Sequence, residues 1–312
     1  MRDVVRRELV ARQLDEQLAG RFPLGQRLRV LDVGMGRGTQ ALRLARAGHM
    51  VTGLEDDPAM ISAAHEALAA EPQGIRERMR IVEGDGRDTG VHFLPGSFDV
   101  VLCHDVLMWV AEPDPLLAGL ARMLAPGGLL SLLVRNGDAL AFGPGLRGDW
   151  SGALAAFDAT ARLPRPRTGS DGETETEPAL RPGPRERADR LADLTATLAG
   201  IGAPLHAWYG VRVFTDTVFP EPPRADGGSP HAGFAPAVLP GATGTTPPVG
   251  AHAAGPHSGF GGGSNVGDVG GGFGDMSGGV DLGTLLAVEE RAGRTDPYRA
   301  VAALLHLCGV RG

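Results

Sequence analysis

Short apolar runs alternate with amphipathic segments along the first 136 residues of the chain. Apolar positions about four residues apart predict a first helix over residues 3–19. Five apolar runs then predict strands, at Leu28–Val33, Met50–Leu54, Arg80–Val82, Val100–Cys103 and Leu129–Val134. Helical patterns separate them, over Thr39–Ala47, Pro58–Leu68 and Pro115–Leu124. Strands that alternate with helices in this way predict an α/β fold with a parallel, doubly wound sheet.

The second half of the chain is interrupted twice. Residues 164–187 are rich in Pro and acidic residues and predict an exposed loop. Residues 221–280 hold 18 Gly and 8 Pro, and such a composition buries too little apolar surface to offset its ordering entropy. Ordered patterns surround these stretches, namely helices over 188–200 and 281–291 and strands over 205–214 and 304–310. We therefore expect one domain, built from residues 1–218 and 281–312, with a disordered insert over residues 219–280.

Charge and cysteine usage narrow the class of protein. The 30 basic residues, all of them Arg, stand against 37 acidic ones, and the net charge of −7 argues against a large non-specific affinity for nucleic acid. Cys103 and Cys308 lie in apolar runs and are too few for a disulfide framework, which favours a reducing, cytoplasmic compartment. No apolar run reaches the roughly 18 residues of a membrane span, and no spacing predicts a metal site. We expect a soluble protein without a metal.

The sharpest motif joins the first strand to the next helix. The strand ends in Asp32-Val33-Gly34-Met35-Gly36-Arg37-Gly38, and the missing Cβ atoms of Gly34, Gly36 and Gly38 let backbone approach a ligand. Glu55 ends the second strand, 21 residues after Gly34, and this is the spacing at which a carboxylate binds both hydroxyls of a ribose. The pattern predicts a site for a nucleotide-containing cofactor.

Two cofactors compete for this motif. A nicotinamide dinucleotide site has its third glycine at the position that Thr39 occupies, so the third glycine of this chain is misplaced for it. A site for S-adenosylmethionine (SAM) has an acid just before the first glycine, as Asp32 is here, and glycines two residues apart. The motif therefore favours SAM, and a nicotinamide-dependent reductase remains the alternative.

Later segments extend this interpretation. The run Phe98-Asp99-Val100-Val101-Leu102-Cys103-His104-Asp105-Val106-Leu107-Met108-Trp109-Val110, followed by Leu124-Ala125-Pro126-Gly127-Gly128, resembles the class I SAM-dependent methyltransferases. The resemblance covers residues 1–136 and the C-terminal strands. It implies a Rossmann-like, mostly parallel seven-stranded sheet with an antiparallel C-terminal strand, and a SAM-binding core over residues 28–136. It also implies that Asp85 contacts the adenine and that His104 faces the methyl-transfer cleft, although both residues fit a purely structural role as well.

Four further motifs are similar to the bacterial tRNA wobble-uridine methyltransferases, which esterify the carboxylate of 5-carboxymethoxyuridine. They are His104-x-Val106-Leu107-x-Trp109-Val110, Leu130-Ser131-Leu132 with Asn136, Gly210-Val211-Arg212-Val213-Phe214 with Asp216, and Pro297-Tyr298 with Leu305-His306. In that family an Arg on the first helix, the acid after strand two and the His after strand four contact SAM. The resemblance implies these roles for Arg2, Glu55 and His104. His104 and Arg212 are the candidates to contact the acceptor.

Two motifs that the sequence lacks limit the type of atom that accepts the methyl group. The chain has no Asn/Asp-Pro-Pro-Tyr run after the fourth strand and no Pro-Cys nucleophile, so oxygen is favoured over an amino nitrogen or a pyrimidine carbon. The acceptor is then a carboxylate on tRNA or a small molecule. A protein that binds SAM without transferring methyl remains open too, and the oligomeric state has no signal in the sequence.

Overall fold

The computed structural model describes residues 1–110, 112–161, 187–218 and 281–312. The exposed loop predicted over residues 164–187, apart from Arg187, lies outside the described residues. So does the disordered insert predicted over residues 219–280.

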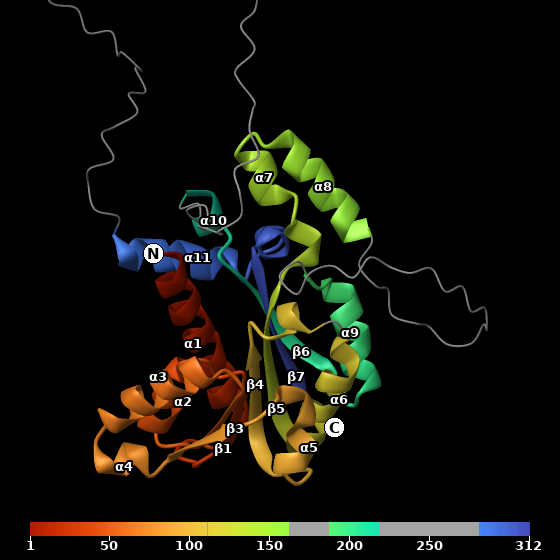
Figure 1. Cartoon of the computed structure of the whole chain (residues 1–312). Coiled ribbons are helices and arrows are strands. Elements are labelled where there is room, and N and C mark those ends of the chain that lie inside the picture. The colour runs from red at the N-terminus through yellow and green to blue at the C-terminus, as the bar shows by residue number, and fades with distance from the viewer. Residues whose placement is uncertain (111, 162–186, 219–280) are drawn as a thin grey trace, which may run out of the picture. The chain divides into compact units, whose positions relative to one another are not determined.

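A single seven-stranded sheet organises the described residues, in the order β3-β2-β1-β4-β5-β7-β6 (Figure 1). Its strands are β1 (Arg29–Val33), β2 (Met50–Glu55), β3 (Met79–Glu83), β4 (Phe98–His104), β5 (Leu124–Arg135), β6 (Leu205–Val211) and β7 (Leu304–Val310). β7 lies between β5 and β6 and runs antiparallel to both, whereas β1 to β5 pair in parallel. The predicted mostly parallel sheet with an antiparallel C-terminal strand is confirmed.

Helices follow most strands. They are α1 (Arg2–Arg21), α2 (Thr39–Arg46), α3 (Pro58–Ala69), α4 (Gln73–Arg76), α5 (Thr89–His92), α6 (Pro113–Met123), α7 (Phe142–Leu146), α8 (Trp150–Ala161), α9 (Leu191–Gly200), α10 (Thr215–Val218) and α11 (Leu282–Ala292). Short 3₁₀ turns lie at η1 (Gly86–Asp88), η2 (Leu107–Trp109), η3 (Gly137–Ala139) and η4 (Tyr298–Val301).

Alternate residues of each central strand build two apolar layers, as the period of two in a strand requires. Val30 and Leu102 face the side covered by α1 and α2, where Leu14 and Leu42 join the same cluster. The intervening residues, such as Val101, pack on the other side with leucines of α6 and α9. Figure 1 shows these helix pairs on opposite faces of the sheet. The core therefore holds the strands so that their carboxyl ends meet at one edge.

The sequence prediction and the structure differ most between residues 137 and 161 and at the ends of β5 and β6; the short helices α4, α5 and α10 were not predicted either. α7 and α8 were not predicted, although Leu146, Trp150, Leu154 and Phe157 recur three or four residues apart; in the structure these side chains are exposed. β5 begins at Leu124 rather than Leu129, with a register shift against β4 between Phe98 and Val100. β6 ends at Val211, because Arg212 takes a φ of 61°, outside the β region. In the described ranges, no helix is both long and apolar enough to cross a membrane.

Candidate functional site

The glycine loop between β1 and α2 turns through left-handed backbone. Gly34, Gly36 and Gly38 have φ of 65°, 55° and 74°, which side chains with a Cβ rarely adopt. A Cβ on Gly34 would also overlap Val106, whereas one on Gly36 would meet no atom within 4 Å. The loop therefore needs glycine for its conformation, and at Gly36 it leaves open space beside the backbone.

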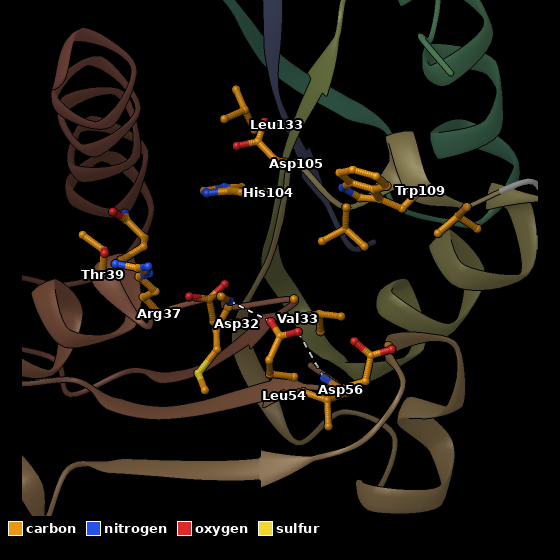
Figure 2. Close-up of a pocket in the computed structure, with 18 of the residues that line it drawn as sticks. Asp32, Val33, Arg37, Thr39, Leu54, Asp56, His104, Asp105, Trp109 and Leu133 are labelled. Carbon is orange, nitrogen blue, oxygen red and sulfur yellow. Dashed lines mark hydrogen bonds between the residues drawn. The ribbon is translucent and has the colours of Figure 1, made fainter. Parts of the chain in front are cut away.

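The carboxylate of Glu55 holds this loop to the end of β2. Its Oε2 accepts the N–H of Gly36 at 2.8 Å, and its Oε1 accepts the N–H groups of Asp56 and Asp57 at 3.2 and 3.1 Å. The side chain is buried. Figure 2 shows Leu54 and Asp56, its neighbours in the chain, with dashed lines for hydrogen bonds between the residues drawn. Two elements far apart in sequence are thus joined at one anionic group.

Two aspartates near Glu55 differ in environment. Asp32, at the end of β1, is buried, and that burial together with the Glu55 charge raises its pKa to about 7. Asp85 caps η1 by accepting the N–H of Arg87 at 2.8 Å. The hydrogen bond from the Arg87 guanidinium lowers the pKa of Asp85, so that this carboxyl stays ionised at neutral pH.

The end of β4 carries His104, and the next residue, Asp105, has a positive φ. His104 is half-buried, and its Nε2 lies 2.8 Å from Ser131 Oγ on β5. Burial lowers the pKa of His104 well below 6.5, and His306, Arg6 and Arg43 lower it further. Asp105 follows with a φ of 59° and forms an ion pair with Arg6 of α1. Figure 2 shows His104 extending from β4 toward α1.

These groups line one cavity of about 770 Å³, which we call the first cavity. Of the predicted cofactor residues it is lined by Asp32, Gly34, Gly36, Glu55, Asp85 and His104. Gly38 does not line it but serves as the N-cap of α2. Sequence reasoning missed Arg6 and Trp109 as lining residues. Trp109 belongs to the motif that begins at His104, and Arg6 lies one helical turn after Arg2, so the sequence could have indicated both as lining residues.

Arg2 and Arg212 lie at a second cavity instead. It has a volume of about 340 Å³ and is lined by the guanidinium-bearing residues Arg2, Arg135, Arg147 and Arg212, together with Asp216. Asp216 forms ion pairs with Arg2 at 2.7 Å and with Arg212 at 3.0 Å. We call this the arginine cavity. It holds more positive than negative side chains, so it suits an anionic group.

The two cavities are neighbours along two elements. On α1, Arg2 lines the arginine cavity and Arg6, one turn later, lines the first cavity. On β5, Leu133 lines the first cavity and Arg135 lines the arginine cavity. A ligand in one is therefore close to a ligand in the other.

A buried glutamate, Glu289, holds the backbone turn that follows Arg212 at the arginine cavity. Glu289 of α11 is fully buried and accepts the backbone N–H groups of Val213, Phe214 and Thr215 at 2.7, 3.0 and 2.7 Å. Three charge-assisted bonds from consecutive residues hold the turn that follows Arg212. These bonds offset the cost of the positive φ of Arg212 and fix the position of its backbone.

Comparisons with known proteins agree with this geometry. Residues 31–132 match the family model of the methyltransferase domain. The chain is 38% identical over 136 residues to the tRNA 5-carboxymethoxyuridine methyltransferase of Escherichia coli (strain K12), a match that covers 44% of this chain and 50% of that protein. It is 33% identical over 138 residues to the ubiquinone biosynthesis O-methyltransferase of Xanthomonas euvesicatoria pv. vesicatoria (strain 85-10), covering 44% and 52%.

The matched residues contain the glycine loop, Glu55, Asp85 and His104 on the expected strands of the expected sheet. Residues 31–132 thus carry a methyltransferase domain. The chain spans about half the length of the curated relatives it matches. A solved structure of a putative sarcosine dimethylglycine methyltransferase from Galdieria sulphuraria aligns with a TM-score of 0.45 and 17% identity, over 65% of this chain and 62% of that one.

Among the described residues, no group of three or more His, Cys, Asp or Glu side chains could hold a metal ion. At the two cavities, the described residues offer arginines, carboxylates and a histidine whose pKa is lowered well below 6.5.

Proposed function

We propose that this protein binds SAM in the first cavity and methylates a carboxylate oxygen of an acceptor held at the arginine cavity. The observation that carries the proposal is the adjacency of the two cavities, one lined by a glycine loop and acids, the other by four arginines. We further propose that residues 1–218 and 281–312 form one domain, because β7 pairs with both β5 and β6.

The first cavity fits SAM in size and in donor set. Its volume of about 770 Å³ lies within the usual range for ligand sites. In this proposal Glu55 binds the ribose hydroxyls, Asp85 the adenine edge, and Asp32 lies beneath the loop of Gly34 and Gly36. Bound SAM supplies a methyl group already activated on a sulfonium. The protein then has to orient the acceptor, which is a large part of catalysis for such a reaction.

The arginine cavity favours a carboxylate acceptor over a hydroxyl. A carboxylate oxygen is already a nucleophile: it forms the new bond to the methyl carbon as the bond from that carbon to sulfur breaks, and no proton has to leave. The site therefore needs a cationic clamp and no general base. Arg212 and Arg147 are suited to this role because a guanidinium binds a carboxylate through two parallel hydrogen bonds.

The proposed acceptor is the carboxylate of 5-carboxymethoxyuridine at the wobble position of tRNA. The similarity to the Escherichia coli enzyme named for this substrate, 38% identity over 136 residues, supports it. The similarity to an O-methyltransferase of ubiquinone biosynthesis supports a small-molecule acceptor on the same domain as the second candidate. In both candidate functions the methyl group is transferred to an oxygen atom of the acceptor.

The test measures binding and transfer separately. Calorimetry with S-adenosylhomocysteine, with NADH alongside, tests the cofactor. Incubation with SAM and tRNA that carries 5-carboxymethoxyuridine, followed by mass spectrometry of the nucleosides, tests the acceptor, and unmodified tRNA is the control. We expect micromolar binding of S-adenosylhomocysteine and a methyl ester on the modified tRNA alone.

Two variants test the clamp. Arg212→Gln should lower kcat/KM for the acceptor at least about tenfold, the usual effect of one charged hydrogen bond, and leave S-adenosylhomocysteine affinity unchanged. Arg76→Gln, at an exposed position on α4, is the matched control and should change neither. Binding of the cofactor without a tRNA ester would refute the tRNA acceptor. Binding of NADH alone would refute the cofactor.

A further inference from the structure

A line of buried polar side chains runs from His104 into the core. Ser131 Oγ lies 2.8 Å from His104 Nε2 and also 2.8 Å from His306 Nε2 on β7. The other nitrogen of that ring, His306 Nδ1, lies 2.8 Å from Gln13 Oε1 on α1. Ser131, His306 and Gln13 are all fully buried, whereas His104 is half-buried and lines the first cavity.

The number of hydrogens available to Ser131, His104 and His306 determines which atom donates in each hydrogen bond. The Ser131 hydroxyl carries one hydrogen, so it donates to one of its two imidazole partners and accepts from the other. Both imidazoles are neutral, because burial lowers the pKa of His306 to about 3 and that of His104 well below 6.5. A neutral imidazole has one N–H and one bare nitrogen. His104 and His306 are therefore in opposite tautomers, since exactly one of the two Nε2 atoms bears a hydrogen.

Gln13 sets the direction of the line. Its Oε1 accepts from His306 Nδ1–H, which leaves His306 Nε2 bare and able to accept from the Ser131 hydroxyl. Ser131 Oγ then accepts from His104 Nε2–H. The nitrogen that remains on His104, Nδ1, is left as a bare acceptor.

We propose that Ser131, His306 and Gln13 are positioning residues that lock His104 in the Nε2–H tautomer, so that its Nδ1 is offered to the first cavity as a hydrogen-bond acceptor. The proposal rests on the proposed function in taking the cofactor as the ligand of that cavity. Since a bare nitrogen accepts but does not donate, the lock selects a ligand group that donates a hydrogen, such as an amine.

The energetic cost of the line supports a functional role. Burying a polar side chain is unfavourable unless its hydrogen-bonding groups are satisfied. Gln13 keeps Nε2 buried with no hydrogen-bond partner in the described part of the chain, which costs about 1–3 kcal/mol. Apolar side chains in these places would avoid that cost. Tyr209 and Cys308 lie against His306 as well, so the ring is confined on several sides.

Histidine tautomers are read directly by long-range ¹H–¹⁵N NMR. In the wild-type protein at pH 6 to 8 we expect His104 as the Nε2–H form and His306 as the Nδ1–H form, each assigned by its loss in H104Q or H306Q. The same tautomer in both rings, a mixture in His104, or the reverse pair would overturn the proposal. The wild-type spectrum decides the point even where a variant fails to fold.

Ser131→Ala supplies the functional arm. Without the hydroxyl, His104 should show both tautomers, and the dissociation constant of S-adenosylhomocysteine should rise about 3- to 10-fold, as for one lost hydrogen bond. Ser97→Ala, whose hydroxyl bonds Leu94 O away from the cavity, is the control and should change neither. An unchanged His104 spectrum in S131A would contradict the lock. A locked pair of tautomers in a protein that binds no S-adenosylhomocysteine would instead contradict the proposed function alone.

Discussion

The carboxyl group of Asp32 makes folding stability depend on pH in a direction that the structure determines. Asp32 is 3% exposed, and burial, with the Glu55 charge as the second cause, raises its pKa from 3.8 to about 7. In the unfolded chain the same group loses its proton near pH 4. The unfolded state is therefore the first to ionise as the pH rises, and this one group lowers the free energy of unfolding between about pH 4 and pH 7.

Asp32→Asn removes this titration and nearly preserves the side-chain volume. A shift of about three pH units, at about 1.4 kcal/mol per unit, amounts to at most about 4 kcal/mol. The free energy of unfolding of D32N should rise relative to that of the wild type by about 1.4 kcal/mol per unit up to pH 7. Above pH 7 the carboxyl is ionised in both states, so the difference should stay constant.

Urea unfolding followed by circular dichroism, at steps from pH 5 to pH 8.5, measures this difference without cofactor. Groups that do not interact with Asp32 titrate alike in the two proteins, so their contributions cancel in the comparison. Parallel stability curves would mean that the pKa of Asp32 is the same in the folded and unfolded chain. A difference that shrinks as pH rises would mean that folding stabilises the carboxylate, and the assignment of Asp32 to a desolvated position would be wrong.

Three further predictions concern single features. Glu55→Gln should weaken S-adenosylhomocysteine binding by about 1.5–3 kcal/mol, because a charged acceptor is lost; calorimetry checks this, with exposed Glu66→Gln as the control, and equal affinities would remove Glu55 from the ribose site. Gly34→Ala should destabilise by about 1–3 kcal/mol more than Gly36→Ala in thermal unfolding, because both have positive φ but only the first also overlaps Val106; equal losses would contradict the overlap. Cys103 and Cys308 should resist a thiol reagent at pH 8 until denaturant is added, because burial raises the pKa of both thiols; rapid native labelling would show that one of them is accessible.

The cofactor side could be predicted from sequence because its determinants are local. Asp32, Gly34 and Gly36 lie within the five consecutive positions 32–36, at the end of β1 and just after it, and Glu55 ends β2. Parallel strands bring such ends together whatever the rest of the chain does. The pattern of apolar residues was therefore enough to predict the sheet and to place the glycine loop and Glu55 at the carboxyl ends of its strands.

The arginine cavity could not be assembled in this way. Arg2 and Asp216 are 214 residues apart, and their pairing depends on how α1 packs against the turn after β6. The motif placed Arg2 on the first helix, but it could not show which of Arg2 and Arg6 lines which cavity, because the two lie one turn apart. Nor does any periodicity show that β7 enters the sheet between β5 and β6.

The two cavities therefore differ in what holds them. The glycine loop is fixed by its own conformation and by Glu55, both within residues 31–57. The turn at Arg212 has an unfavourable φ and is held by Glu289, which comes from a helix beyond residue 280. His306, also from that C-terminal part, holds the line that ends at His104. The glycine-loop side of the first cavity is thus held by local contacts. The arginine cavity and the His104 side of the first cavity depend instead on segments that are distant in sequence.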